Sequence, residues 1–323
     1  MEPGLTLPEP PFSGIATFGR QPLLPADWKQ RTGSGKPRVA VVGIPYDSAT
    51  SYRSGTRFGP RSIREQSLLL WGFNNAQQVA PFEALELYDA GDVPIIPADI
   101  LATQRAIELR VGELLTGGYS ILSLGGDHSI ALPLIRAHAQ QHGPLAVVHF
   151  DSHPDTWDEE FPGQKYGHGT PFRRALEERL IDPARYIQIG IRGPTPAASD
   201  YADARTLGAR LITTDEAMAL GTVGVVQQIR DRIGDRPYYL TFDIDVVDPA
   251  YAPGTGTPEV GGFSSWQILQ IVRGLRGLPL LGADLVEVSP PYDSQGITAI
   301  LAANLAFEFL SLMALWSNPS PTQ

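Results

Sequence analysis

The feature that most constrains this chain is a short apolar segment that leads directly into three side chains of the metal-binding type. Leu145–Val148 follows Gly143-Pro144 and ends in two β-branched residues, so it is predicted to be a buried strand. Asp151, His153 and Asp155 follow at a spacing of two. In an extended segment, residues at this spacing point to the same side. Open α/β sheets bind ligands where their strands end, so the pattern predicts a site there. A polar turn that caps a helix is the alternative interpretation.

Strand-like runs alternate with helical patterns along most of the remaining chain. This alternation predicts an α/β domain with a mostly parallel, buried sheet. The other expected strands are Arg38–Ile44, Leu85–Leu87, Ser120–Leu124, Tyr186–Ile191, Arg210–Thr213, Pro237–Phe242 and Leu278–Val286. The expected helices are Ser62–Leu70, Asp99–Leu115, Ile130–Gln141, Pro171–Arg179, Asp215–Leu220, Val223–Ile233, Ser264–Leu275 and one from about Ser294. Residues 37–318 are therefore expected to form one catalytic domain, after a Pro- and Gly-rich arm over residues 1–36.

Composition excludes several classes of function. The net charge is −10 and basic residues form no run, which argues against nucleic acid or an anionic membrane surface as a partner. Cysteine is absent, so any metal must be bound by histidines and carboxylates. No signal-peptide pattern follows Met1, which favours a cytoplasmic location. Gly296–Trp316 is long and apolar enough to cross a membrane, but Asn304 and Glu308 interrupt it. It is expected to be a buried C-terminal helix instead.

Two further predicted strands also end in potential metal ligands. His128 follows Ser120–Leu124, and Asp243 and Asp245 follow Pro237–Phe242. With the three ligands after Leu145–Val148, these side chains suit two divalent ions that share carboxylates. A ligand set rich in oxygen favours manganese over zinc, with nickel or cobalt as possible substitutes. Independent caps at the three strand ends are a less economical explanation of the same residues.

The remaining histidines and one acid have simpler expected roles. His149 lies on the strand before Asp151 and is expected to be a core residue or a support for a ligand. His138 and His142 lie on a polar helix and are expected to be solvated. Asp127 is expected to support its neighbour His128.

Three motifs resemble the ureohydrolases, the arginase and agmatinase family, and are most similar to agmatinase. They are Gly125-Gly126-Asp127-His128-Ser129, Asp151-Ser152-His153-Pro154-Asp155, and the stretch from Phe242-Asp243-Ile244-Asp245 to Pro258. The resemblance extends from about Val39 to the C-terminal helix. It implies a three-layer α/β/α domain with a mostly parallel eight-stranded sheet, assembled as a homo-oligomer, a trimer or a hexamer. Ser152 stands where the family usually has Ala, and it is expected to point away from the metals.

The resemblance also implies a role for each ligand. His128 and Asp155 would bind the first of two manganese ions, His153 and Asp245 the second, and Asp151 and Asp243 would bridge both. Two ions lower the pKa of a water molecule, and Asp155 would accept a hydrogen bond from that attacking water. His168, in His168-Gly169-Thr170, matches a proton shuttle for the leaving amine. Glu287 matches the carboxylate that grips the guanidinium group, although a plain ion-pair role is the alternative.

The loop after the second motif bears on the substrate. It contains the acids Asp158, Glu159 and Glu160 against the single cation Lys165, and it lacks the Asn-bearing pattern of arginase. Such a field favours a cationic tail, so agmatine, hydrolysed to putrescine and urea, is the expected substrate. The alternatives are 4-guanidinobutyrate, 3-guanidinopropionate and guanidine, the last because Trp157 is positioned to shorten the pocket. A two-metal phosphoesterase and a non-catalytic binding protein are the competing functions, and both fit the acid-rich strand ends and the complete ligand set less well.

Overall fold

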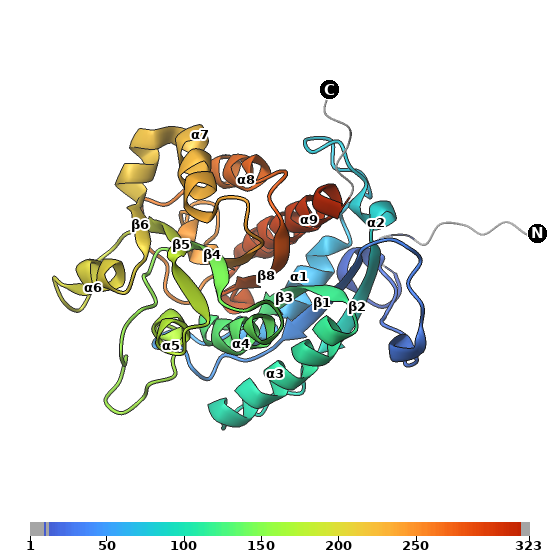
Figure 1. Ribbon diagram of the computed structural model, residues 1–323, viewed down its shortest axis with the longest axis horizontal. Helices are drawn as coiled ribbons and strands as arrows, with labels where there is room; N and C mark the ends of the chain where they lie inside the picture. Colours follow the sequence, from blue (N-terminus) through green and yellow to red (C-terminus); the bar gives the residue numbers. More distant parts are fainter. Residues whose placement is uncertain (1–9, 11–12, 318–323) are drawn as a thin grey trace, which may run out of the picture.

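The core of the protein is one eight-stranded sheet in which every neighbouring pair of strands is parallel. The computed structural model describes residue 10 and residues 13–317, and Figure 1 shows its elements. The strand order is β2-β1-β3-β8-β7-β4-β5-β6. The strands are β1 (Arg38–Ile44), β2 (Glu86–Asp92), β3 (Tyr119–Gly125), β4 (Leu145–Phe150), β5 (Ile181–Ile191), β6 (Arg210–Thr213), β7 (Tyr238–Asp243) and β8 (Leu280–Val286). The predicted α/β class with a parallel eight-stranded sheet is confirmed.

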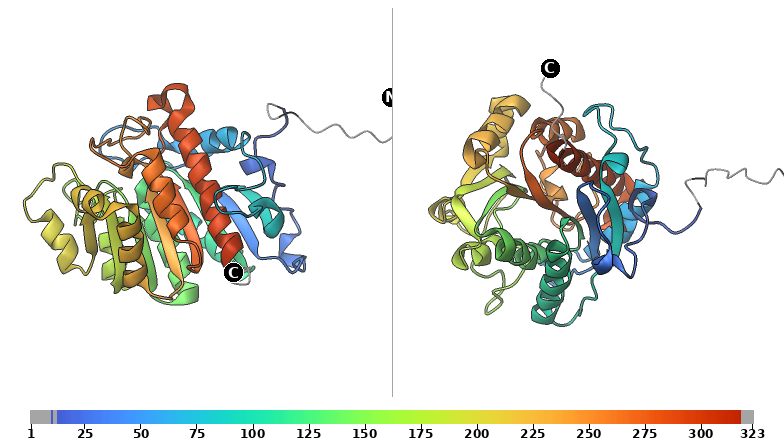
Figure 2. Two further views of the ribbon diagram at one scale, coloured as in Figure 1. Left: turned by 90° about the horizontal axis from the view of Figure 1, so that it is seen from above. Right: turned by 45° about the vertical axis from the view of Figure 1, so that its right-hand side comes forward.

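Helices cover both faces of this sheet and make the three layers (Figure 2). Side chains on β1 alternate between two cores: Val39 and Val41 join one, and Ala40 and Val42 join the other. This period of two is what a strand buried on both faces requires. The first core includes α1 (Gly59–Ser67), α7 (Thr214–Ile233), α8 (Ser265–Gly274) and α9 (Ile297–Ser317); the second includes α3 (Ile100–Thr116), α4 (Ala131–His142) and α5 (Pro171–Glu177).

The elements differ from the expected ones mainly in length. Strand β2 was predicted to end at Leu87 but continues to Asp92. Strand β5 begins at Ile181, five residues before the predicted Tyr186. The two helices predicted at Asp215–Leu220 and Val223–Ile233 are confirmed as the two helical segments of α7, which is broken between them at Gly221, where φ is 66°. Two short helices were not predicted at all, α2 (Pro81–Ala84) and α6 (Asp200–Thr206).

The C-terminal helix is a core element, as expected. The segment Ser294–Trp316 is long and apolar enough to cross a membrane, but 83% of its most apolar window is buried inside the protein. Glu308, the acid that interrupts it, is buried and bonded: Arg273 Nε donates to its Oε1 at 2.7 Å, and Asn74 Nδ2 donates to its Oε2 at 3.0 Å. A buried charge needs such partners, and they tie α9 to α8 and to the loop before α2.

The described part of the predicted arm packs along the edge of the sheet next to β2. Phe18 is fully buried, and its N–H donates to Asp89 Oδ2 at 2.8 Å. Leu23 forms an isolated parallel bridge with Asp89, and Trp28 packs edge-on against Tyr119. The arm therefore covers an otherwise open edge of the sheet. Residues 1–9, 11, 12 and 318 of the predicted arm and domain lie outside the described residues.

Candidate metal centre and active site

Four strands that are neighbours in the sheet deliver all the predicted site residues to one edge. In the order β3, β8, β7, β4, they are followed by His128, by Glu287, by Asp243 and Asp245, and by Asp151, His153 and Asp155. The order places β8 between β3 and β7, so Glu287 lies between the two groups of ligands. The six predicted metal ligands are brought together although they come from three separate parts of the chain, and all but His153 are buried.

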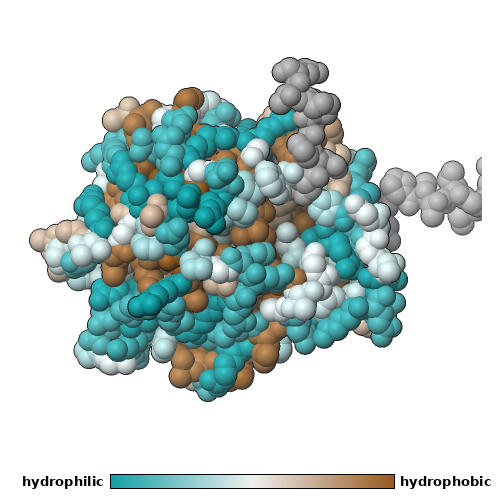
Figure 3. All heavy atoms as spheres, viewed as in Figure 1, coloured by the Kyte–Doolittle hydropathy of each residue, from teal (hydrophilic) through white to brown (hydrophobic). Residues whose placement is uncertain are grey.

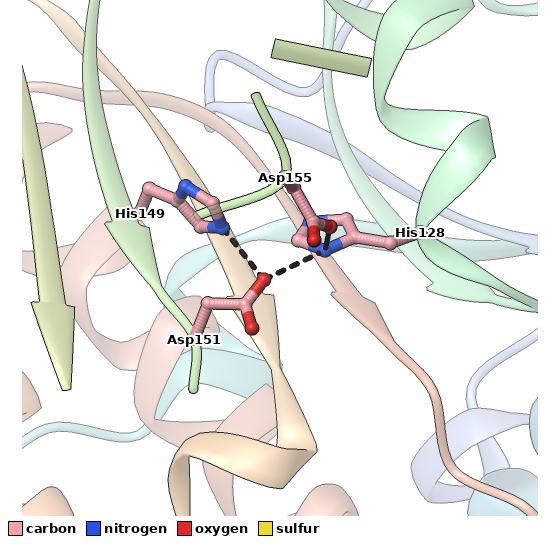
Figure 4. A group of neighbouring side chains, drawn as sticks. All are labelled: His128, His149, Asp151 and Asp155. Carbon is pink, nitrogen blue, oxygen red and sulfur yellow. Dashed lines mark hydrogen bonds and ion pairs between the residues drawn. The ribbon is translucent and has the colours of Figure 1, made fainter. Parts of the chain in front are cut away.

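His128 is the centre of the first group of ligands. Its Nδ1 lies 3.0 Å from Asp151 Oδ2, 2.9 Å from Asp155 Oδ2 and 3.4 Å from Asp243 Oδ2. Figure 4 shows the carboxylates of Asp151 and Asp155 turned toward this imidazole. None of these contacts has hydrogen-bond geometry, so Nδ1 is a buried nitrogen without a hydrogen-bond partner among the described residues. A nitrogen so placed is suited to a cation shared with the carboxylates.

A chain of hydrogen bonds on the far side of His128 fixes its tautomer. His128 Nε2 is 2.8 Å from Thr241 Oγ1, and Thr241 donates its own proton to Asp284 Oδ1 at 2.7 Å. Since the threonine proton is used on Asp284, its oxygen must accept from Nε2–H. The lone pair of His128 therefore sits on Nδ1 and faces the carboxylates, as metal ligation requires.

The second group of ligands surrounds His153. Its Nδ1 lies 3.0 Å from Asp245 Oδ2 and 3.5 Å from Asp151 Oδ1. Asp151 thus presents one carboxylate oxygen to each group, which is the arrangement a bridging ligand needs. Asp243 contacts His128 but makes no recorded contact with His153, so its bridging role stays a prediction.

His149 contacts the predicted bridging ligand Asp151, which fits one of the two roles expected for it, the support of a ligand. It is fully buried, and its Nε2 lies 2.8 Å from Asp151 Oδ2, as Figure 4 shows. Its Nδ1 is 3.0 Å from Tyr186 Oη, and its ring stacks on Phe172 at 4.0 Å between centroids. A proton on Nε2 would hold the bridging carboxylate in place.

Two expectations about individual side chains were wrong. Ser152 does not point away from the ligands: its Oγ donates to Asp245 Oδ1 at 2.7 Å, because the turn after β4 passes directly beside that carboxylate. His138 is not solvated but fully buried, because its side of α4 packs on the sheet. A Cβ at Gly282 would lie 2.5 Å from His138 Nε2, so this glycine makes the room for the ring. Burial lowers the pKa of His138 to about 4.

The acids of the cluster disturb one another's protonation. Burial and the charge of Asp151 raise the pKa of Asp155 to about 7, and burial and Asp245 raise the pKa of Asp243 well above its usual range. Burial acts in the same direction on Asp151, but the three imidazoles around it hold its pKa well below the ordinary value. In the absence of cations the cluster therefore retains protons that divalent ions would displace.

The donor set fits divalent ions, and this leads to a first prediction. Two groups of side chains have ligand atoms close enough to share an ion: His128, His149, Asp151 and Asp155, and Asp151, His153 and Asp245. Asp243 lies beside the first group, 3.4 Å from His128 Nδ1, and this nitrogen lacks a hydrogen-bond partner among the described residues. Such a set, rich in carboxylate oxygen, meets the needs of an oxygen-preferring ion. We expect manganese to raise the melting temperature of chelated protein by roughly 5 °C or more, since an ion at a hundred times its Kd adds about 2.7 kcal/mol. The shift should be larger at pH 8 than at pH 6, because binding must displace protons. Equal melting temperatures with and without the ion, measured by scanning calorimetry, would contradict a metal centre.

A cavity of about 160 Å³ opens beside the ligands. Its wall includes three residues predicted to act on the substrate, Asp155, Trp157 and His168, and also Ser51 and Glu160, which were not predicted as site residues. Trp157 is fixed by a hydrogen bond from its Nε1 to Asp200 Oδ2 at 3.0 Å. Neither Ser51 nor Glu160 belongs to a motif, and only their place in the folded chain identifies them.

Glu287 does not line the cavity itself but contacts His168, which does. Its Oε1 accepts from the N–H of His128 at 2.8 Å and is 2.9 Å from His168 Nδ1. Its Oε2 is buried and has no hydrogen-bond partner among the described residues. The residue also has a positive φ of 63°, a strained conformation that is typical of functional positions. Glu287 Oε2 is thus a free acceptor on a residue that contacts His168 in the cavity wall. This position is compatible with the predicted hydrogen bonds to a guanidinium group.

Known proteins resemble this chain over nearly its whole length. The model of the Arginase family matches residues 37–311. Guanidinopropionase of Pseudomonas aeruginosa is 46% identical over 94% of this chain and 93% of its own length, and a mitochondrial agmatinase of Gallus gallus is 44% identical over 85% and 81%. The structure of proclavaminate amidino hydrolase from Streptomyces clavuligerus matches with a TM-score of 0.88 and 44% identity, over 95% of this chain and 100% of that one. The chain therefore belongs to the arginase family, as its three motifs predicted.

Proposed function

We propose that this member of the arginase family hydrolyses the guanidino group of agmatine, with putrescine and urea as products. One observation supports the choice of agmatine: no Lys or Arg stands among the described residues that line the cavity, so its wall offers no cation to pair with a carboxylate tail. A tail that ends in an ammonium group needs no such partner, and the acids of the adjacent loop, Asp158 and Glu159, favour it. Arg57, in the loop after β1, is paired with Asp47.

The position of each side chain supports the catalytic role that we propose for it. Two divalent ions held by the six ligands would supply an activated water. Asp155 is placed to accept a hydrogen bond from that water. The free Oε2 of Glu287 is placed to accept from a guanidinium N–H, a charge-assisted bond that orients the planar group. His168 gives a proton to the nitrogen that leaves as the carbon–nitrogen bond breaks.

A guanidino acid is the second candidate substrate. Guanidinopropionase is named for such a compound and is as similar to this chain as the agmatinase is. The indole of Trp157 in the cavity wall also favours short substrates, 3-guanidinopropionate or guanidine among them. These candidates share the chemistry of the guanidino group and differ only in what the tail must contact.

We propose manganese as the ion, a homo-oligomer as the assembly and the cytoplasm as the location. The ion follows from the four carboxylates in the ligand set. The assembly is supported by large apolar side chains on the surface, including Trp71 at 78% and Trp266 at 64% exposure. Figure 3 shows several hydrophobic groups on an otherwise hydrophilic face. A membrane-spanning role is not supported, because the apolar helix α9 is buried.

The substrate proposal predicts a clear order of specificity. We expect kcat/KM for agmatine to exceed the values for 3-guanidinopropionate, 4-guanidinobutyrate and guanidine by about tenfold or more, and arginine to be hydrolysed most slowly. The measurement is urea release from manganese-loaded protein, with the nickel-loaded protein in parallel. A guanidino acid that is preferred to agmatine by more than about tenfold, ~1.4 kcal/mol of transition-state stabilisation, would overturn the choice of agmatine.

A further inference from the structure

Glu160 is a nearly buried carboxylate around which the loop between β4 and α5 closes. Only 11% of its side chain is exposed, and its Oε2 accepts from the N–H of Gly169 at 2.9 Å. A Cβ at Gly167 would lie 2.1 Å from Oε2, and one at Gly169 would lie 3.0 Å from Cδ. A side chain at Gly167 would displace this carboxylate, while at Gly169 the nearest obstacle is the Trp157 ring, 2.6 Å from the added carbon. The backbone on either side of His168 thus leaves room for Glu160 and for Trp157.

The other oxygen of Glu160 faces His168. Glu160 Oε1 is 3.3 Å from His168 Nε2, while His168 Nδ1 is 2.9 Å from Glu287 Oε1. The imidazole thus lies between two carboxylates, one on each ring nitrogen. The N–H of Ser51 donates to Nε2 at 3.0 Å, the contact of a neutral ring with its proton on Nδ1, and Ser51 Oγ lies 2.7 Å from Nε2. Glu160, His168 and Ser51 all line the cavity, so Nε2 is the nitrogen on the substrate side.

We propose that Glu160 is a positioning residue for His168, which holds the imidazole with Nε2 toward the cavity and keeps a proton on it until the leaving amine takes that proton. The proposal rests on the proposed hydrolysis of a guanidino group. As the carbon–nitrogen bond breaks, the bonding pair stays on the departing nitrogen, which accepts the proton from Nε2. His168 is left neutral: it keeps its Nδ1 proton, which donates to Glu287 Oε1, and Nε2 then accepts from the N–H of Ser51. A solvent proton restores the charged imidazole.

The charges around His168 support this role. The groups that face it are Glu160 from its own loop, Glu287 after β8, and Asp127 before His128. Burial disfavours the charged ring, but Glu287 and Glu160 outweigh burial and raise the pKa of His168 well above its ordinary value. Removing the charge of Glu160 should lower this pKa, so His168 would lose its Nε2 proton at a lower pH.

The test is a Glu160→Gln variant, whose amide oxygen can still accept from Gly169. We expect the alkaline limb of the pH profile of kcat to move down by roughly one unit, the effect of one nearby charge on a buried group. The shift should be the same with agmatine and with guanidine, and metal content should not change. Glu160→Asp keeps the charge, so its alkaline limb should lie close to that of the parent protein. Glu159→Gln, on the same loop but exposed, is the matched control and should leave the profile unmoved.

A second measurement separates this proposal from the proposed function. In zinc-loaded protein labelled with 15N-histidine, the signal of His168, assigned with a His168→Asn variant, should titrate about one unit lower in Glu160→Gln than in the parent. This readout needs no substrate, so it holds even if the guanidino compounds are not hydrolysed. An unchanged titration would overturn the role of Glu160. A rise in KM for agmatine alone, with the pH profile unmoved, would also overturn it and make Glu160 a contact of the substrate tail.

Discussion

An Asp151→Asn variant is expected to lose metal and activity together, with kcat/KM lower by at least about a thousandfold. Both oxygens of this carboxylate are used: Oδ2 lies 3.0 Å from His128 Nδ1 and 2.8 Å from His149 Nε2, and Oδ1 accepts from the N–H of His153 at 2.6 Å. An amide offers one oxygen and no charge, so it cannot serve two ions. Loss of a residue that only supports a ligand costs 10–100-fold, and loss of a shared ligand should cost more.

The measurement for Asp151→Asn is metal content per chain beside urea release. Asp243→Asn should behave in the same way if Asp243 is also a shared ligand, and retention of one ion would show that it serves only the His128 group. Asp158→Asn is a suitable control, since this acid of the next loop is 59% exposed and pairs with Arg174 outside the cluster. If Asp151→Asn kept both ions and full turnover, the assignment of the two ligand groups would be wrong.

The fold was predictable because the sheet is buried on both faces. Such strands are continuous apolar runs, and β1 was placed to the residue for that reason. The two missed helices, Pro81–Ala84 and Asp200–Thr206, are too short to show a helical period. The error at β2 has a different cause: Asp89 and Asp92 look like loop residues, but Arg64 pairs with both of them and allows the strand to continue.

The convergence of the six predicted ligands could be foreseen from the strands that carry them. Each ligand follows a recognisable strand end, and parallel strands bring those ends to one edge. The supporting residues carry no such signal. Thr241 and Asp284 lie within strands. Thr241 contacts His128 Nε2, and its own hydrogen bond to Asp284 depends on β7 lying beside β8. Glu160 has no pattern either, since its contact with His168 exists only after the loop has folded back on itself.

A His168→Ala variant should keep its metal and lose turnover. The ring contacts Glu287, Glu160 and Ser51 and none of the six predicted ligands, so removing it leaves the ligand set intact. We expect kcat to fall by roughly 10²–10⁴-fold, the usual contribution of a positioned general acid. Metal content and kcat should be measured on the same sample, and added imidazole, which can enter the space left by the ring, should restore part of the rate.

The outcome for His168→Ala separates two functions of the carboxylates around it. If the acid is lost, the fall should be smallest at low pH, where solvent can protonate the leaving amine, and the melting temperature of the loaded protein should hardly change. If His168 instead only neutralises Glu287 and Glu160, its loss leaves these two carboxylates buried and unpaired on either side of the cavity left by the ring. The loaded protein would then melt several degrees lower, as removal of one partner of a buried pair is strongly destabilising. Full activity in the variant would remove His168 from the mechanism, and with it the role proposed for Glu160.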